Sequence, residues 1–327
     1  MSRTYPVGAS WQLVLHDLGV DPADLLPRVG LPPDLLTQDR PRLDAASWLG
    51  LWEALQDALG GDDLALRLGQ GVPVEAYDPS LLAALCSQDL VGAVERLSTY
   101  KQLTCPFALG LDEGAARTTV EVRGADGLTL PRTLARMELV FLVHFARRAT
   151  RAEIRPLEVQ VPAGELPGPA YAAWFGAPVR EGGGWCLVFR TEDARRPFLT
   201  ANAALQQVYE PELQRRLAQA RTEAPTAERL RGRLLELLPS GRTTIEAAAR
   251  ALGLSVRSLQ RRLREEGTSF QAELATARER LATHYLRTSS LPPAEISFLL
   301  GYDDPNSFFR AFHAWTGRTP EGVRGEA

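Results

Sequence analysis

One face of the segment at residues 256–265 carries side chains that can donate paired hydrogen bonds. These side chains occur at i, i+3, i+4 and i+7, a spacing that puts them on one side of a helix: Arg257, Gln260, Arg261 and Arg264. Arginine can donate two parallel hydrogen bonds to O6 and N7 of guanine, and glutamine can pair with N6 and N7 of adenine. The pattern therefore predicts a helix that reads base edges in a DNA major groove.

A second segment, at residues 305–316, repeats the arrangement with other residue types. Asn306 and Arg310 share one helical face, and His313 follows on it. Asparagine pairs with adenine as glutamine does, so this face offers the same chemistry. For His313 the alternatives are a phosphate contact and no contact, and we favour no contact. Each segment also has an apolar stripe for packing: Val256, Leu259 and Leu263 in the first, and Phe308, Phe312 and Trp315 in the second.

A solvated surface is the simpler interpretation of one isolated arginine-rich helix, because Glu265 and Glu266 would balance its charge. Two observations favour DNA instead. The polar faces have matching chemistry, and they lie about 49 residues apart in two stretches with the same helix-turn-helix pattern. We therefore interpret both faces as DNA-reading surfaces.

The turns before these helices predict how the two faces are positioned. In the first unit Ala249 stands four residues before Gly253, which suits two closely crossing helices joined by a turn with positive φ. Ser255 is then placed to cap the following helix. In the second unit Ser297 and Gly301 keep the four-residue spacing, and the turn is one residue longer. Asp303 or Asp304 can cap the following helix, and Pro305 occupies a first-turn position.

Both units resemble a known family. The sequence "EISFLLGYDDPNSFFRAFHAWTGRTPEGVR" resembles the C-terminal signature of AraC/XylS-type transcription regulators, and "TTIEAAARALGLSVRSLQRRLREEGTSFQAEL" resembles their first helix-turn-helix. The resemblance covers residues 228–325 and implies a seven-helix domain in which "FQAELATARERLATHYL" is a long helix joining the two units. It also implies that the helices beginning near Ser255 and Asp304 enter successive major-groove segments. The implied base-contacting positions are Arg257, Gln260, Arg261, Asn306 and Arg310.

One position of the second unit departs from the family pattern. Ser297 stands where the family usually has alanine. A serine hydroxyl inside a helix can bond to a backbone carbonyl one turn earlier, so we expect little effect.

The preceding part of the chain predicts a separate α+β domain. Residues 1–60 and 77–103 have helical periodicity, "PRTLARMELVFLVHFARRAT" predicts an apolar helix, and strands are expected at "FALGLDEGAARTTVEVRG", "IRPLEVQVP" and "REGGGWCLVFR". The fold class is therefore an α+β sensor domain followed by an all-α domain with two helix-turn-helix units. We place a ligand-sensing domain at 1–204, a helical connection and linker at 205–227, and a DNA-binding domain at 228–327 with helix-turn-helix units at 243–265 and 292–316.

The charge distribution permits a nucleic-acid partner at the C-terminal end. The 327 residues carry a net charge of −3. From Pro225 onward the chain has 15 arginines and 12 acidic residues, a net charge of +3, so the net charge of the first 224 residues is −6. No apolar run approaches the roughly 20 residues that span a bilayer, and the N-terminus lacks a signal-peptide pattern, so we expect a cytoplasmic protein associated with the nucleoid. The cysteines are expected to be buried free thiols: Cys86, Cys105 and Cys186.

The N-terminal part resembles, more loosely, the effector domain of the branch of this family that contains ornithine-responsive regulators. The matching stretches are "RLDAASWLGLWEALQDALGGDDLALRLGQGV" and "LLAALCSQDLVGAVERLSTYKQL". The resemblance implies a small-molecule sensor with dimer contacts, but the sequence assigns no ligand residue. Aromatic residues fill cores more often than they contact ligands, and two of the arginines end a helix where cations are favoured. The candidates are Tyr77, Tyr100, Cys105, Phe107, Trp174 and Trp185, and Arg132, Arg136, Arg147 and Arg148.

An enzyme is the competing class, because DNA-binding helices of this family also occur joined to repair activities that transfer a methyl group to cysteine. Cys105 is followed by proline and phenylalanine, not by histidine, and the four histidines show no nucleophile or metal spacing. The glycines at 182–184 lack phosphate-loop spacing and precede a strand. We therefore expect no catalytic activity, no cofactor and no metal.

The sequence thus predicts an effector-controlled, sequence-specific transcription regulator. Its expected partners are double-stranded operator DNA, a small-molecule effector, RNA polymerase and a second copy of the chain, with no membrane partner. The alternative is a ligand-independent architectural DNA-binding protein, and the long acidic N-terminal region counts against it.

Overall fold

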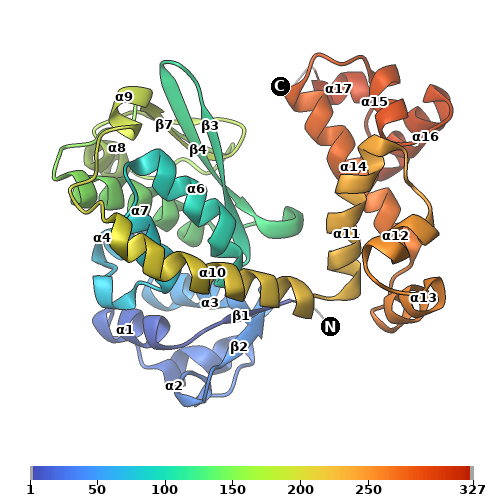
Figure 1. The fold of residues 1–327 in the computed structure, drawn as a ribbon. Coiled ribbons are helices and arrows are strands. Elements are labelled where there is room, and N and C mark those ends of the chain that lie inside the picture. Colours follow the sequence, from blue (N-terminus) through green and yellow to red (C-terminus); the bar gives the residue numbers. More distant parts are fainter. Residues whose placement is uncertain (1–2, 325–327) are drawn as a thin grey trace. The chain divides into compact units, whose positions relative to one another are not determined.

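The computed structural model describes residues 3–324 and, within that range, the side chains of all but residues 9–10, 221–223 and 287–288. The chain divides into two compact units between Ala220 and Arg221. The first unit contains helices and a five-stranded sheet, and the second is helical throughout (Figure 1). This confirms the predicted fold class.

Helices make up most of the first unit, and several of them begin where an aspartate side chain accepts a backbone N–H. Asp44, Asp78 and Asp89 cap α3, α5 and α6 in this way. In chain order the helices are α1 (Ala9–Asp17), α2 (Pro22–Leu25), α3 (Ala45–Leu59), α4 (Leu64–Gly71), α5 (Pro79–Leu85), α6 (Leu90–Tyr100), α7 (Arg132–Thr150), α8 (Pro169–Phe175), α9 (Thr191–Ala194) and α10 (Ala203–Glu223).

The main sheet has the strand order β3-β4-β7-β5-β6, in which only the β5–β6 pair is parallel. Its strands are β3 (Phe107–Glu113), β4 (Arg117–Gly124), β5 (Glu158–Val161), β6 (Val179–Glu181) and β7 (Trp185–Arg190). The expected hairpin is β3–β4, in which Leu109 pairs with Val122. A separate antiparallel pair, β1 (Thr4–Pro6) and β2 (Arg42–Asp44), was not predicted.

The triple glycine forms the turn that leads into a strand, β7, as the sequence predicts, and a short strand that was not predicted, β6, precedes it. β6 and β7 flank β5 on opposite sides, so the 182–184 turn must pass close to the end of β5. A Cβ on Gly182 would lie 2.9 Å from Oε1 of Gln160 in β5. Gly182 therefore leaves room for the Gln160 side chain, whereas a Cβ on Gly183 would meet nothing within 4 Å.

α7 is buried on nearly every side, although the sequence predicts one apolar face. Residues 133–143 are all buried, including Arg136 and Glu138, which pair with Asp62 and Lys101. Among the expected buried thiols, Cys86 and Cys105 are buried, but Cys186 is only half-buried. The reason is strand alternation, which turns Leu187 and Trp185 toward the core and Cys186 to the other face.

The second unit consists of seven α-helices between Thr226 and Arg324, as the family resemblance implies. They are α11 (Thr226–Leu237), α12 (Ile245–Ala251), α13 (Val256–Glu265), α14 (Phe270–Thr288), α15 (Pro293–Leu299), α16 (Pro305–Thr316) and α17 (Pro320–Arg324). α14 contributes to two apolar cores, one shared with α11–α13 and one with α15–α17. Figure 1 shows α13 and α16 toward opposite ends of α14. Among the described helices, none is long and apolar enough to cross a membrane.

The polar stretch "RTEAPTAE" is more helical than its composition indicates. α10 continues to Glu223 and α11 begins at Thr226, so Ala224 and Pro225 alone separate the two helices. Proline at this point ends α10, because its ring disfavours a helical conformation of the preceding residue.

Candidate nucleic-acid interface

The first helix-turn-helix consists of α12 and α13. Thr244 caps α12, and the turn between the helices contains Gly253 with φ of +67°. The Ser255 hydroxyl accepts the backbone N–H of Ser258 at 3.1 Å and caps α13. The backbone donors at the start of α13 are thus partly satisfied, and the helix begins at a defined residue.

The two faces of α13 separate as the sequence predicts. Leu259 and Leu263 are fully buried, at 0% exposure. The polar residues of the opposite face are all exposed: Arg257, Gln260, Arg261 and Arg264. Because the leucines anchor one side of the helix in the core, the arginine-rich side must face outward.

The second helix-turn-helix, α15 and α16, has the same construction. Gly301 has φ of +71°, and the Asp304 carboxylate accepts the backbone N–H of Ser307 at 2.9 Å. Asp304 is therefore the capping residue, and Pro305 occupies the first turn. Phe308 and Phe312 are fully buried, while the polar face is exposed: Asn306, Arg310 and His313.

Most side chains of the two outward faces have no hydrogen-bond or ion-pair partner among the residues that the structure describes. Two arginines make local contacts: Arg261 pairs with Glu265 at 2.9 Å, and Arg310 donates to the Ser307 hydroxyl at 3.3 Å. Both contacts are at the surface, where a phosphate or a base can replace them at little cost. Among the described residues, no hydrogen bond or ion pair engages the side chains of the others: Arg257, Gln260, Arg264 and Asn306.

Arg278, in the middle of α14, holds the turn between α15 and α16 in place, a role that its local sequence does not indicate. Its guanidinium donates to the carbonyls of Leu300 at 2.9 Å and Gly301 at 3.0 Å, and it lies 4.3 Å from the centre of the Tyr302 ring. The Ser297 hydroxyl donates to the Ala294 carbonyl at 2.6 Å, as predicted. α14 therefore holds the second helix-turn-helix, α15 and α16, through polar contacts as well as through the apolar core that they share.

Glu266 has a structural role, not the screening role that its position beside the arginines indicates. Its carboxylate accepts the backbone N–H groups of Thr226 and Ala227 at 2.7 and 2.8 Å, so it caps α11. Burial acts to raise the pKa of Glu266, but these N–H donors outweigh it and hold the pKa below its ordinary value. No local sequence pattern reveals this contact, because 39 residues separate Glu266 from Ala227.

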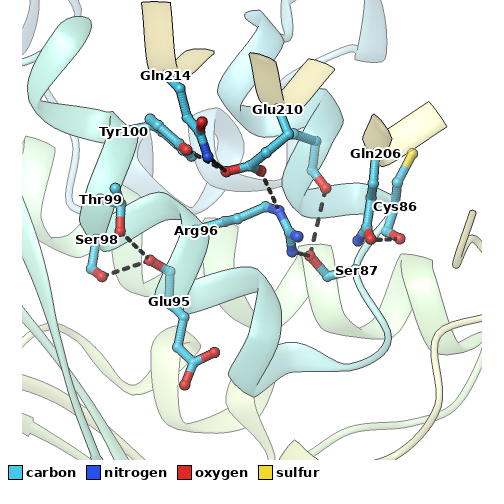
Figure 2. Close-up of polar contacts among 11 residues, drawn as sticks. Cys86, Ser87, Glu95, Arg96, Ser98, Thr99, Tyr100, Gln206, Glu210 and Gln214 are labelled. Atoms are coloured by element: carbon cyan, nitrogen blue, oxygen red, sulfur yellow. Dashed lines mark hydrogen bonds and ion pairs between the residues drawn. The ribbon is translucent and has the colours of Figure 1, made fainter. Parts of the chain in front are cut away.

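α10, the helix that leads to the second unit, is held in the first unit by a polar cluster centred on Glu210 (Figure 2). Arg96 of α6 donates to the Glu210 carboxylate at 3.3 Å and to the Ser87 hydroxyl at 3.0 Å. The Tyr100 hydroxyl also donates to Glu210, and Gln214 adds a third donor at 3.2 Å. We call these five side chains the Glu210 clasp.

Apolar packing continues the clasp along the same side of α10. Leu213 and Leu217 are buried against Ala83 of α5 and the ring of Tyr100. One helical turn before Glu210, the Gln206 amide donates to the Cys86 carbonyl at 2.8 Å. α10 is therefore attached to the α5–α6 pair over three turns, although its sequence is polar.

The structure uses most of the candidate ligand residues of the first unit for contacts within the fold. Tyr100 belongs to the clasp, and Cys105 is buried, its thiol donating to the Lys101 carbonyl at 3.3 Å. Two of the arginines are used internally: Arg136 bonds to Asp62 at 2.7 Å, and Arg147 donates to three backbone carbonyls and lies over the Trp174 ring. Phe107 and Trp185 are buried in the core, Trp174 packs at its edge, and Arg132 is exposed.

Comparison with known proteins agrees with this organisation. A family model described as the arabinose-binding domain of AraC transcription regulator, N-terminal, matches residues 19–198, and a helix-turn-helix domain model matches residues 248–326. The ornithine utilization regulator of Pseudomonas aeruginosa is 32% identical over 319 residues, covering 95% of this chain and 93% of that protein.

Two further proteins are similar over most of their length. The transcriptional regulator VirS of Mycobacterium tuberculosis is 28% identical over 326 residues, covering 95% of this chain and 93% of VirS. The crystal structure of the transcriptional regulator CdpR from Pseudomonas aeruginosa aligns with a TM-score of 0.46 and 21% identity, covering 97% of this chain and 96% of CdpR.

Proposed function

Because the chain belongs to the AraC family of transcription regulators, we propose that it reads a specific operator by inserting α13 and α16 into successive major-groove segments. The observation that carries this proposal is the pair of exposed polar faces, each on a capped helix whose opposite side is anchored in a core. The residues proposed to contact DNA are Arg257, Gln260, Arg261, Arg264, Asn306 and Arg310.

Two kinds of contact have separate roles in this mechanism. Arginines and helix N-termini that bind phosphates set the affinity and its dependence on salt. Arg261 and Arg310 select guanine, and Gln260 and Asn306 select adenine, through paired hydrogen bonds to base edges. Sequence choice therefore resides in a few side chains, whereas affinity is spread over the whole basic surface.

The N-terminal unit supplies regulation. A small molecule bound there shifts the protein between states with weak and strong operator binding, and α10 transmits the change because it is attached to α5–α6 and leads directly into α11. The protein acts as a homodimer in the cytoplasm, on nucleoid DNA and with RNA polymerase as a partner. It has no catalytic role.

The test begins with selection of genomic fragments by the full-length protein at about 150 mM salt, close to physiological ionic strength. A recovered motif is then used to measure operator affinity for Arg261→Ala and Arg310→Ala. Each change is expected to cost about 1–3 kcal/mol of binding and to relax preference at one position of the motif. Arg233→Ala is the control, because Arg233 is an exposed arginine that pairs with Glu236 within α11, which belongs to neither helix-turn-helix unit.

Two results would contradict the proposal. If both variants bound the motif within twofold of the unchanged protein, the assigned faces would be wrong. If the protein bound all fragments equally, in a salt-dependent manner and with no enriched motif, it would be an architectural DNA-binding protein instead.

A further inference from the structure

Three hydrogen-bonding side chains of the N-terminal unit gather at one face of α7. The Tyr77 ring packs against Phe141 and Phe145 of α7, with ring centres 5.8 and 6.4 Å apart. His144 and Arg148 follow Phe141 at three and seven residues, so they share the helical face on which Tyr77 rests. The packing of the Tyr77 ring on Phe141 and Phe145 thus brings a phenol to the helical face that carries an imidazole and a guanidinium.

None of these three side chains has a hydrogen bond or an ion pair with another described residue. Tyr77 is only 7% exposed and its hydroxyl is buried, so its lack of a protein acceptor is unfavourable. His144 and Arg148 are half-buried, and Arg148 lies near enough for its charge to act on Tyr77. Burial lowers the pKa of His144, and the positive charges of Arg148 and Arg147 lower it further, so the ring is a neutral donor or acceptor beside a cation.

The neighbouring charged groups are already engaged. Arg147 is bonded to backbone carbonyls, and the Asp78 carboxylate, next to Tyr77 in the sequence, accepts the N–H groups of Ser80 and Leu81 at 2.7 and 3.1 Å. Among the described residues, Arg148 is consequently a cation at this face without an ion-pair partner, and Tyr77 and His144 supply neutral hydrogen-bonding groups.

We propose that Tyr77, His144 and Arg148 bind the carboxylate of a small organic acid, which is the effector of the regulator. This inference rests on the proposed function and names the chemical class of its ligand. One guanidinium and one hydroxyl match a singly charged carboxylate, because arginine can donate two parallel bonds to its two oxygens. A phosphate, with about twice the charge, would call for further cations.

The position of this face explains how ligand binding affects α10. Phe198 packs on Phe145 with ring centres 6.0 Å apart, and the backbone N–H of Leu199 donates to the Ala149 carbonyl at 2.8 Å. α10 begins at Ala203, four residues later. A carboxylate that reorders the Tyr77–Arg148 face therefore acts on the segment that enters α10.

The test is a titration of the full-length protein with propanoate, followed by NMR through the ring nitrogens of His144, whose signals are assigned with His144→Gln. Propanamide is the neutral control of the same shape. Propanoate should shift the His144 signals with a Kd on the order of 1 mM, and propanamide should not. Arg148→Gln should weaken propanoate binding at least about tenfold, and Tyr77→Phe about threefold.

Tyr77→Phe keeps the ring on Phe141 and Phe145, so it tests the hydroxyl even if Arg148→Gln fails to fold. Arg132→Gln removes an exposed arginine from the same helix and should leave propanoate binding unchanged. The inference is overturned if propanamide binds as well as propanoate, if Tyr77→Phe binds propanoate like the unchanged protein, or if inorganic phosphate binds more tightly. It also fails if propanoate does not bind while operator binding persists, and that result leaves the proposed function intact.

Discussion

The Glu210 carboxylate of α10 accepts a hydrogen bond from the hydroxyl of Tyr100 in α6, 110 residues earlier in the chain. Burial, followed by the hydrogen bond and the charge of Glu210, raises the pKa of Tyr100 to about 12, so the hydroxyl stays protonated and remains the donor. One carboxylate thereby ties the helix that leads to the DNA-reading unit to the body of the sensor unit.

Replacing Glu210 by glutamine should loosen α10. The substitution removes the charge that Arg96 and Tyr100 bond to, and the expected cost is about 1–2 kcal/mol, in the range of a partly buried charged hydrogen bond. Hydrogen exchange of the α10 amides between Gln206 and Leu217 should accelerate about tenfold.

Glu212→Gln is the matched control for this change. Glu212 lies on the same helix and its ion pairs are with Arg215 and Arg216, both exposed residues of α10. Exchange in α10 should remain as in the unchanged protein, because exposed pairs of this kind contribute little. Equal effects of Glu210→Gln and Glu212→Gln would show that the clasp does not hold α10.

The two turn glycines should respond differently to alanine. Both have positive φ, so alanine strains the backbone by about 1–2 kcal/mol at either position. A Cβ on Gly253 would meet nothing within 4 Å, whereas a Cβ on Gly301 would lie 2.5 Å from Cγ2 of Thr243. Gly301→Ala should therefore lose about 1–2 kcal/mol more than Gly253→Ala.

Urea-dependent hydrogen exchange in α14 measures this difference, because α14 contributes to both cores of the second unit. Equal losses for the two variants would mean that the Thr243 side chain moves away from residue 301 without a cost in free energy.

Glu266 should make the start of α11 sensitive to acid. Its folded-state pKa lies below the ordinary value of 4.5, so its stabilising contribution is complete above that pH and is lost as the pH falls through the lower, folded-state pKa. Glu266→Gln should cost about 0.5–1 kcal/mol near neutral pH and less near pH 3.

Hydrogen exchange of the Thr226 and Ala227 amides reports this contribution directly, since these groups bond to Glu266. Glu265→Gln is the control, because Glu265 is an exposed neighbour that pairs with Arg261 instead. A cost that stayed constant from neutral to acid pH would contradict the role of the ionised carboxylate.

Ser297 should tolerate alanine but not a larger side chain. The residue is fully buried, and its hydroxyl is satisfied within α15 by the Ala294 carbonyl, so removing the hydroxyl leaves no other group unpaired. Ser297→Ala should change the free energy of unfolding by less than about 0.5 kcal/mol, while Ser297→Leu should lose about 2–3 kcal/mol through overpacking. Thermal unfolding of the two variants, with operator affinity as a second readout, checks both expectations.

The helix-turn-helix units could be predicted in detail because their information is local. Capping serines and aspartates, turn glycines and i, i+4 stripes act within a few residues, so Ser255, Gly253 and Leu259 have in the structure the places that their spacing predicts. The matching family resemblance depends on the same local signals. For the first unit, alternation and helical periodicity likewise predicted the hairpin and most helices.

Contacts between distant residues were decided by the tertiary structure alone. The sequence places Glu266 among surface charges, yet folding brings it to the start of α11, and only the packing of α14 against the second turn gives Arg278 its carbonyl partners. The sequence of α10 is too polar to predict that this helix packs against α6. Its attachment depends on Arg96 and Tyr100 of α6, which lie beside Glu210 in the folded chain. Local patterns determine which helices form and which faces are polar, whereas hydrogen bonds across 20 to 120 residues depend on where the whole chain places its helices.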